Sequence, residues 1–483
     1  MFQYDFSNHQ NRHIRITDMP AEYFQRIQET TRKDPYYPVW HIAPKCGLMN
    51  DPNGLCEING IHHIFYQWFP AGPVHGLKHW YHLTTKDFIH YEDHGVAMYP
   101  DTESDSYGCY TGMALKEGEK VHVFYTGIEN EEMIPCTCYA RFDGEKLTDR
   151  KKIVEMDPDQ TTMNYRDPYV WKRDSEYWML TGAESKEHEG ILMLYRGKQA
   201  DSYEYAGRVR LLQNGQEAML GYMLECPNYY EENQKGVLFC SPMGISSENK
   251  YDYKNVFSVV YMIGKPLDTE RKEFQFSEMY ELDKGFDFYA PQTFEDAKGR
   301  RILIGWMGLP DVEEEYTNPT AKDEGWQHCL TIPREITLHD GRLYQYPVEE
   351  MKALRGRCCE IDETQKNIEV WKPFALDLKL DSRKCRISVG DDLMFEADGR
   401  EACLRLSEKV GAGRKQRKAV IPSGRLKELR MLVDTTAVEI YLNHGEVVFS
   451  TRYYPGKTTQ VVKLEADKIQ GHIYELKEMT GIK

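Results

Sequence analysis

His63-Ile64-Phe65-Tyr66 is the first of five short apolar runs that recur along the chain. The other runs are Val121-His122-Val123-Phe124-Tyr125, Tyr177-Trp178-Met179-Leu180, Val237-Leu238-Phe239-Cys240 and Ile302-Leu303-Ile304-Gly305-Trp306. Counted from Ile64 through Val123, Met179, Leu238 and Leu303, successive runs are 59, 56, 59 and 65 residues apart. Such near-continuous apolar runs are typical of strands buried on both faces. A repeat of this length, made of several short strands, predicts a five-bladed β-propeller over residues 35–346.

The regions outside the repeats follow other patterns. Residues 1–34 form a leader in which 17–32 is expected to be a short helix, capped by Thr17 or Asp18 and with Pro20 in its first turn. Residues 347–356 form a polar linker, and apolar and polar residues alternate along the strands expected in 357–483. Because such alternation suits sheets with one wet face, 357–483 is predicted to be a β-sandwich. The expected fold class is all-β.

Charge and composition exclude several classes of protein. Lys and Arg total 61 against 77 Asp and Glu, a formal net charge of −16. This acidic excess repels nucleic acid and anionic membranes, so neither is expected as a partner. The first residues lack a secretory signal, no apolar run is long enough to cross a bilayer, and the 12 Cys include no CxxC pair. We therefore expect a cytoplasmic protein with reduced thiols.

Four acidic residues keep step with the repeat. Asp51, Asp167, Glu225 and Asp287 are separated by 116, 58 and 62 residues. Equivalent positions at the start of the inner strands of a propeller converge on its axis, so three or four of these carboxylates are expected to share one funnel. Each local sequence alone, such as Asp-Pro-Asn-Gly, is more often a turn than an active site. The shared period is what favours a functional role.

Two of these acids suit the cleavage of a glycosidic bond, which uses one carboxylate as nucleophile and another as proton donor. Asp51 lies in an Asn-Asp-Pro-Asn-Gly turn whose amide donors favour the ionised form. Leu224 and Cys226 offer Glu225 a less polar setting, which favours the protonated form. Arg166 places a fixed positive charge beside Asp167.

Several ordered motifs resemble those of glycoside hydrolase family 32. They are Gly47-Leu48-Met49-Asn50-Asp51-Pro52-Asn53-Gly54, Phe65-Tyr66-Gln67, Arg166-Asp167-Pro168, Glu225-Cys226-Pro227, Asp287-Phe288-Tyr289-Ala290-Pro291-Gln292, Gly305-Trp306-Met307 and Cys329-Leu330-Thr331-Ile332-Pro333-Arg334-Glu335. The resemblance covers nearly the whole chain. It implies a five-bladed propeller followed by a sandwich, in agreement with the repeat. It also implies a retaining β-fructofuranosidase that releases fructose from sucrose or sucrose 6-phosphate.

The resemblance assigns roles residue by residue. Asp51 would be the nucleophile, Glu225 the general acid and base, and Asp167 the stabiliser of the transition state. Retention would place the carboxyls of Asp51 and Glu225 roughly 5–5.5 Å apart. The residues expected to bind substrate are Asn50, Gln67, Trp80, Tyr110, Thr111, Arg166, Cys226, Tyr289 and Trp306. Neither a metal nor an organic cofactor is expected.

One loop departs from the common family pattern. Gly72-Pro73-Val74-His75-Gly76-Leu77-Lys78-His79 resembles the corresponding segment of the intracellular bacterial members that hydrolyse sucrose 6-phosphate. His75, Lys78 and His79 would place up to three cationic or donor groups where a phosphate on the glucose side could bind. A polar loop of this kind is also often merely solvated.

Other functions stay open at this point. A fructo-oligosaccharide or fructan hydrolase differs from the expected enzyme in its leaving group, and a fructosyltransferase differs in its acceptor. A carbohydrate-binding propeller without catalysis is a more remote alternative, because it would not need to keep Asp51, Asp167 and Glu225 together. The expected partner is a small sugar or sugar phosphate. The sequence leaves open whether the protein is a monomer or a homodimer.

Overall fold

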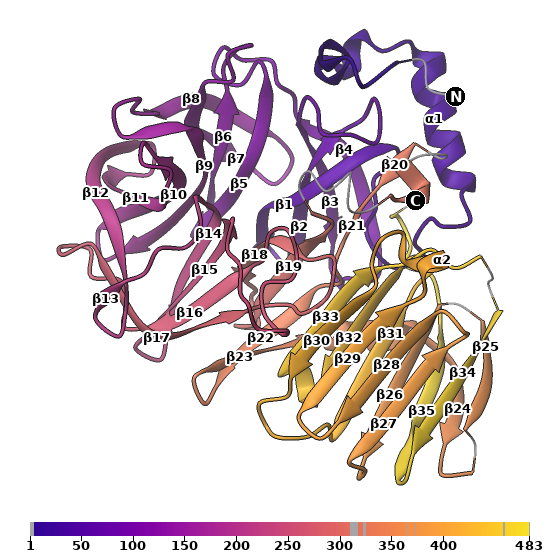
Figure 1. The fold of residues 1–483 in the computed structure, drawn as a ribbon. Coiled ribbons are helices and arrows are strands. Elements are labelled where there is room, and N and C mark those ends of the chain that lie inside the picture. The colour runs from indigo at the N-terminus through magenta and orange to yellow at the C-terminus, as the bar shows by residue number, and fades with distance from the viewer. Residues whose placement is uncertain are drawn as a thin grey trace.

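A computed structural model describes residues 4–309, 317–321, 325–364, 366–371, 373–456 and 459–482. Within these ranges the chain forms a five-bladed β-propeller followed by a two-layered β-sandwich, so the all-β prediction is confirmed (Figure 1). No helix in the described ranges is long and apolar enough to cross a membrane.

The leader contains two 3-10 turns and one α-helix. They are η1 (His9–His13), η2 (Ile16–Asp18) and α1 (Ala21–Lys33). The predicted helix therefore begins later than expected: Thr17 and Asp18 lie in η2, and Pro20 takes the N-cap position with no side-chain cap. Helix α1 buries Tyr23, whose hydroxyl donates to the carbonyl of Ala71 at 2.7 Å. This contact attaches the leader to the propeller.

The propeller blades are built from successive antiparallel strands. The first blade is β1 (Gly47–Ile58), β2 (Ile61–Phe69), β3 (His79–Thr85) and β4 (Tyr91–Met98), with β20 (Trp326–Gln327) added in parallel to β1. The second is β5 (Gly108–Glu117), β6 (Lys120–Ile128), β7 (Pro135–Phe142) and β8 (Leu147–Glu155). The third is β9 (Thr161–Arg173), β10 (Glu176–Ser185), β11 (Gly190–Gln199) and β12 (Ser202–Gln213), with β13 (Gln216–Glu217) beside β12.

The last two blades complete the ring. The fourth is β14 (Met223–Glu232), β15 (Lys235–Met243), β16 (Val260–Gly264) and β17 (Glu273–Glu281). The fifth is β18 (Tyr289–Glu295), β19 (Arg301–Met307), β22 (Arg334–His339) and β23 (Arg342–Pro347), with β21 (Cys329–Leu330) beside β19. The first strands of neighbouring blades contact one another around a ring that closes between β18 and β1. The five apolar runs of the sequence are the second strands β2, β6, β10, β15 and β19, which are almost wholly buried.

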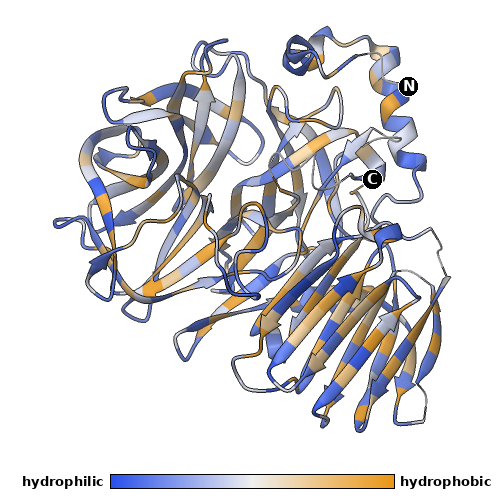
Figure 2. Cartoon of the chain, viewed as in Figure 1, coloured by the Kyte–Doolittle hydropathy of each residue, from blue (hydrophilic) through white to orange (hydrophobic). Residues whose placement is uncertain are grey.

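The chain then passes through η4 (Glu349–Leu354) into the sandwich. One sheet has the order β24 (Arg355–Ile361), β35 (Ile469–Leu476), β26 (Phe374–Leu380), β31 (Glu428–Val433), β32 (Ala437–Leu442) and β33 (Val447–Arg452). The other has the order β25 (Asn367–Trp371), β34 (Thr459–Ala466), β27 (Lys384–Val389), β28 (Leu393–Asp398), β29 (Glu401–Leu406) and β30 (Gln416–Val420). Two short helical turns, α2 (Glu408–Gly411) and η5 (Asn443–Gly445), complete the domain. Hydrophobic and hydrophilic residues alternate along many of these strands (Figure 2), and β27 has the predicted alternation of buried and exposed residues, whereas β32 and β33 are buried throughout and have no wet face.

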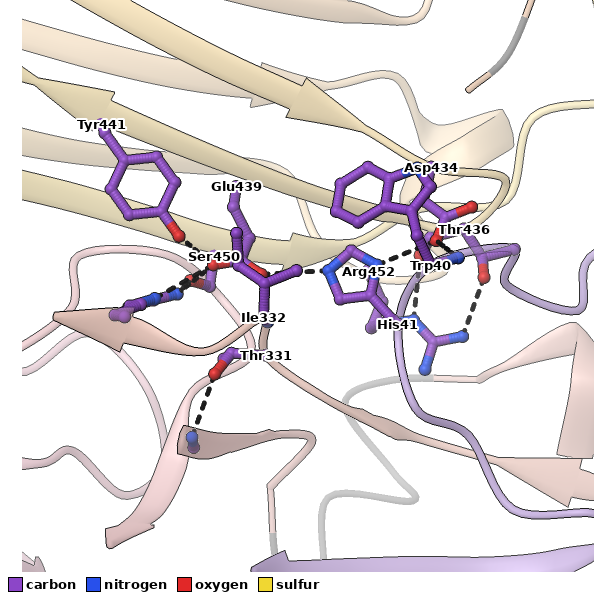
Figure 3. A network of polar contacts seen from close by, with 12 residues as sticks. Trp40, His41, Thr331, Ile332, Asp434, Thr436, Glu439, Tyr441, Ser450 and Arg452 are labelled. Atoms are coloured by element: carbon purple, nitrogen blue, oxygen red, sulfur yellow. Dashed lines mark hydrogen bonds and ion pairs between the residues drawn. The ribbon is translucent and has the colours of Figure 1, made fainter. Parts of the chain in front are cut away.

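A buried ionic network joins propeller and sandwich (Figure 3). His41, on the segment before β1, contacts Asp434 Oδ2 through Nδ1 at 2.9 Å and Glu439 Oε1 through Nε2 at 3.0 Å. Arg334 of β22 contacts Glu439 and also Asp283, at 3.1 Å from Asp283 Oδ2. All of these side chains are fully buried. Because buried charges are costly unless they are paired, the network constrains the relative position of the two domains.

Candidate active site

Asp51, Asp167 and Glu225 lie on β1, β9 and β14, the first strands of three blades. Cys226 shows that these strands bring the acids together. Its Sγ lies 3.7 Å from Asp51 Oδ2 and 3.5 Å from Asp167 Oδ2, and its backbone N–H donates to Asp167 Oδ2 at 2.9 Å. Glu225, the residue directly before Cys226, is close enough for its charge to raise the pKa of both Asp51 and Asp167. Three of the four acids that keep step with the repeat therefore meet at one place.

The fourth acid has another role. Asp287 forms a two-pronged ion pair with Arg414 of the sandwich, at 2.6 Å for each contact, and both side chains are buried. Burial raises the pKa of Asp287, but the Arg414 guanidinium outweighs this effect and holds it below the usual range. Of the three or four carboxylates expected to share the funnel, Asp287 is thus the one that does not, because it is bound to Arg414 at the domain interface.

All five first strands contain the same irregularity where they approach the site. In each, two residues stand opposite one residue of the second strand, which is a β-bulge. The bulged pairs are Asn50-Asp51, Tyr110-Thr111, Asp167-Pro168, Cys226-Pro227 and Ala290-Pro291. Three of the five bulges contain a proline (Pro168, Pro227 and Pro291), which lacks the N–H that a regular ladder would use. The bulges re-aim side chains that a regular strand would direct into a blade.

The bulges also show how far the acids occupy equivalent positions in their blades, as their regular spacing in the sequence suggested. Asp51 is the second residue of its bulge, Asp167 is the first of its own, and Glu225 still pairs with Ser241 just before its bulge. The acids therefore do not occupy one repeated position. They occupy three successive positions of the same bulged segment: the residue before the bulge, its first residue and its second residue. Their carboxylates therefore lie at different places around one centre.

Asp51 is held by neutral donors. Asn50 Nδ2 donates to its Oδ1 at 3.1 Å, and the hydroxyl of Thr111 donates to its Oδ2. Gln67, opposite this bulge, contacts both Asn50 and Thr111. Burial raises the pKa of Asp51, and the hydrogen bond from Thr111 opposes that rise. The expected amide donor is present, but burial was not anticipated from the turn sequence.

Glu225 has polar partners, which corrects the expectation of an apolar setting. Arg166 Nε donates to its Oε1 at 2.8 Å, and the hydroxyl of Tyr289 donates to its Oε2 at 2.6 Å. Leu224 flanks Glu225 in sequence but points to the opposite face of the strand, whereas Cys226 lies in the bulge and its thiol faces Asp51 and Asp167. Its actual surroundings come from other blades.

Asp167 is buried between the other acids. Burial raises its pKa, and the adjacent Arg166 opposes the rise. The Asp167 backbone N–H donates to Thr126 Oγ1 at 2.8 Å. Its carboxylate Oδ2 accepts from Cys226, whereas Oδ1 has no hydrogen-bond partner among the described residues. This oxygen is an acceptor suited to a sugar hydroxyl.

Aromatic rings line the site on the side of the fifth blade. The Trp306 ring lies 6.3 Å from Tyr289, 5.9 Å from His75 and 5.1 Å from His328. His328 and Thr126 were not predicted from the sequence. Thr126 directly follows one of the recurrent apolar runs and stands opposite the bulge at Tyr110-Thr111. Its place at the end of a recurrent run could have marked it as a site residue in the sequence. His328 has no such signal, because its contact with the Met49 carbonyl joins residues far apart in sequence.

Two expected site residues are part of the core instead. Trp80 is fully buried, packs near Phe65 and Tyr125, and donates its indole N–H to the Tyr110 carbonyl at 3.0 Å. Trp80 therefore stabilises the bulge at Tyr110-Thr111 from the core of the blade. His79 is 1% exposed, and burial lowers its pKa to about 4.

The loop from Gly72 to His79 is less cationic than expected. Burial, followed by the charge of Lys78, lowers the pKa of His75 well below its usual range. His75 and His79 are thus neutral near pH 7, and Lys78 supplies the loop's positive charge. Its Nζ lies 2.7 Å from Asn50 Oδ1 and 3.0 Å from His75 Nδ1. Lys78 consequently bridges the Asp51 side of the site and the loop.

Comparison with known proteins shows similarity over almost the whole chain. Residues 41–347 match the glycosyl hydrolases family 32 N-terminal domain, and residues 388–478 match the family 32 C-terminal domain. A sucrose-6-phosphate hydrolase of Vibrio alginolyticus is 37% identical over 487 residues, covering 98% of this chain and 97% of that protein. One from Bacillus subtilis (strain 168) is 33% identical over 445 residues, with 90% and 92% coverage.

Solved structures give the same picture. The sucrose-6-phosphate hydrolase from Lactobacillus gasseri superimposes with a TM-score of 0.90 at 28% identity, covering 98% of this chain and 99% of that one. A variant of the Bombyx mori GH32 beta-fructofuranosidase BmSUC1 in complex with sucrose gives a TM-score of 0.81 at 25% identity, with 99% of each chain covered.

Proposed function

The chain belongs to glycosyl hydrolase family 32, and from this membership we propose how its site cleaves a sugar. It is a glycoside hydrolase that acts on the β-fructofuranosidic bond of sucrose-type sugars. The observation that carries the proposed mechanism is the meeting of Asp51, Asp167 and the strand bearing Glu225 around Cys226. Two carboxylates beside one bond, with a third nearby, suffice for double displacement.

In the first step, a carboxylate oxygen of Asp51 attacks the anomeric carbon of the fructosyl unit. Glu225 gives its proton to the glycosidic oxygen, so the bond to the glucose unit breaks and a fructosyl ester of Asp51 forms. The hydrogen bonds from Asn50 and Thr111 orient the attacking carboxylate. Asp167 offers Oδ1 to the fructose hydroxyls, and its carboxylate stabilises the positive charge that develops on the ring.

The second step reverses these roles. Glu225 takes a proton from water, the water attacks the anomeric carbon, and Asp51 leaves, so fructose is released with retention of configuration. The partners of Glu225 indicate which oxygen carries the mobile proton. Oε1 faces Arg166, which can only donate, whereas Oε2 faces the Tyr289 hydroxyl, which can donate or accept. The proton therefore belongs on Oε2.

Replacing Asp51 by Asn tests the nucleophile. We expect kcat to fall by at least about 1,000-fold, since no ester can form at an amide. Circular dichroism and calorimetry check that the variant is folded. Asp143→Asn is the control, because Asp143 is an exposed loop residue that bonds only its own turn. Substantial turnover by folded Asp51→Asn would reject the assignment.

We further propose sucrose 6-phosphate as the preferred substrate. Similarity to several sucrose-6-phosphate hydrolases supports this, as does a buried lysine beside Asn50 in a protein of net charge −16. The test compares kcat/KM for sucrose 6-phosphate and for sucrose. A preference of at least about tenfold is expected from one charge-assisted contact to the phosphate. Equal values would reject the preference and leave the β-fructofuranosidase activity intact.

A further inference from the structure

The leader contains a basic segment, His9–Arg15, that carries two arginines, two histidines and no acid. Such a segment is conspicuous in a chain with 16 more acidic than basic residues. It lies directly against the loop before β3. The Leu77 N–H donates to the Arg12 carbonyl at 2.7 Å. At Gly76, a β-carbon would come within 2.5 Å of the same carbonyl oxygen, so glycine allows this close approach.

The loop brings one neutral donor to the edge of the site. Lys78 can only donate, so its 2.7 Å and 3.0 Å contacts require Asn50 Oδ1 and His75 Nδ1 to be acceptors. A neutral imidazole that accepts at Nδ1 carries its proton on Nε2. His75 is therefore set as an N–H donor, in the tautomer that can bind an anion. Its ring lies 5.9 Å from Trp306, on the aromatic wall of the site.

The two arginines of the segment form hydrogen bonds through different side-chain nitrogens. Arg15 uses both terminal nitrogens, contacting the carbonyls of Pro100 and Ser106. Arg12 is anchored through Nε, which donates to the Phe6 carbonyl at 2.9 Å. Its charge acts on His75 in the same direction as that of Lys78. Thus a neutral histidine contacts a lysine of its own loop and is close enough to a leader arginine to be affected by its charge.

We propose that Arg12 is a specificity-determining residue that binds the phosphate of sucrose 6-phosphate together with the Nε2–H of His75. The inference rests on the proposed preference for the phosphorylated substrate. A guanidinium anchored at Nε presents its remaining N–H groups in a plane that matches two phosphate oxygens. Lys78 stays with Asn50 and sets the tautomer of His75. The leader thereby becomes part of the substrate site, although it lies outside the propeller.

The test measures kcat/KM for sucrose 6-phosphate and for sucrose in the wild type, Arg12→Gln and Arg12→Lys. Arg12→Gln is expected to lower the ratio of the two values by at least about tenfold, mainly through KM for the phosphorylated sugar, with partial recovery in Arg12→Lys. Competitive inhibition by inorganic phosphate should weaken in parallel. Arg26→Gln is the matched control, because Arg26 is an exposed arginine of α1 that lies over the Tyr23 ring, and it should leave the ratio unchanged.

The two ways to fail are distinguishable. A wild type that prefers sucrose 6-phosphate, with an unchanged ratio in folded Arg12→Gln, would overturn the role of Arg12 and keep the proposed function. A wild type with equal kcat/KM for both sugars would overturn both. Activity on sucrose reports folding of each variant. If Arg12→Gln loses that activity as well, the ratio in Arg12→Lys decides, and an unchanged ratio there with unchanged inhibition by phosphate overturns the proposal.

Discussion

Asp51 and Glu225 lie in one site but receive different hydrogen bonds. Asp51 accepts from an amide and a hydroxyl, which orient it without neutralising its charge. Glu225 accepts from a guanidinium and a phenol, and it must exchange a proton twice in each proposed cycle. A phenol can follow such a change by turning its hydroxyl, whereas a guanidinium cannot. The pair of partners at Glu225 thus suits an acid that becomes a base.

Tyr289→Phe tests this arrangement at the level of one oxygen atom. Losing a hydrogen bond to a charged group costs about 1.5–3 kcal/mol, so kcat should fall about 10- to 100-fold. The pH–rate profile should also shift, because the proton-carrying oxygen loses its partner. Tyr23→Phe is the control, since its hydroxyl bonds the Ala71 carbonyl and joins the leader helix to the propeller. An unchanged pH profile in Tyr289→Phe would contradict the role of this hydroxyl.

At the level of elements, the repeated bulge is the feature that builds the site. Every first strand carries it, yet only some bulges contact the acids: Asn50-Asp51, Tyr110-Thr111, Asp167 and Cys226 contribute an acid or a contact to one, whereas Ala290-Pro291 does not contact an acid in any described interaction. Asp167 and Cys226 have positive φ values of 65° and 47°. Non-glycine residues occupy this region at a cost, which the surrounding contacts must offset.

Gly182→Ala tests how closely the elements are packed around the site. Gly182 stands on β10 opposite Arg166, and a β-carbon there would lie 1.8 Å from the Leu224 carbonyl oxygen. Overpacking of this kind typically costs about 1–3 kcal/mol, and here it must move the strand that bears Glu225. We expect Gly182→Ala to have a lower Tm than the wild type. We also expect its kcat to fall by more than the small unfolded fraction of the variant would explain.

The control is Gly456→Ala, because Gly456 is exposed and a β-carbon added there would meet no atom of the described residues within 4 Å beyond its chain neighbours. Both variants are compared by kcat at a temperature well below Tm. Wild-type kcat in Gly182→Ala would show that β14 tolerates displacement without effect on Glu225.

At the level of the whole molecule, the interface between propeller and sandwich is held by buried charges. His41 contacts a carboxylate through each ring nitrogen, so both nitrogens must carry protons. Burial alone would lower the pKa of His41, but the hydrogen bonds to Asp434 and Glu439 outweigh burial and raise it. Burial would raise the pKa of Glu439, but Arg334 and His41 lower it to about 2. The interface is therefore built for an imidazolium between two carboxylates.

This pairing makes stability depend on pH in a defined direction. Because the folded pKa of His41 lies above its ordinary value of 6.5, its contribution is full below that value and is lost as pH rises through the folded pKa. Because the pKa of Glu439 is depressed from 4.5, its contribution is full above 4.5 and is lost as pH falls toward about 2. The network is thus most stabilising between about pH 4.5 and 6.5.

His41→Gln should lower the free energy of unfolding by about 3–5 kcal/mol at pH 6, the usual cost of breaking a buried ion pair. The difference from wild type should be smaller at pH 9 than at pH 6, because the stabilisation by His41 is lost as pH rises through its raised folded pKa. Scanning calorimetry at both pH values measures it. His188→Gln is the control, because His188 is largely exposed in its pair with Glu184. A destabilisation independent of pH would argue that His41 acts only by packing.

Sequence patterns were sufficient for the blades and for the candidate acids. The five apolar runs predicted the second strands, because a strand buried on both faces must be apolar throughout, and this requirement is local. The motifs around Asp51, Asp167 and Glu225 were enough to identify the family, and they singled out three acids that the structure brings together. The sequence placed the start of the first helix too early. The helix begins at Ala21, and Pro20, which was expected in its first turn, takes the N-cap position instead.

What tertiary structure alone decided is where each side chain faces and what it meets. The period could not separate three successive bulge positions, because a shift of one or two residues is small against a repeat of about 59, and a shift of one residue already reverses the facing of a strand residue. Nor could it place Trp80 and His79 in the core, Asp287 against Arg414, or Arg12 beside the His75 loop. Those outcomes depend on contacts between distant segments, and burial and charge pairing are properties of the packed chain rather than of any stretch of it.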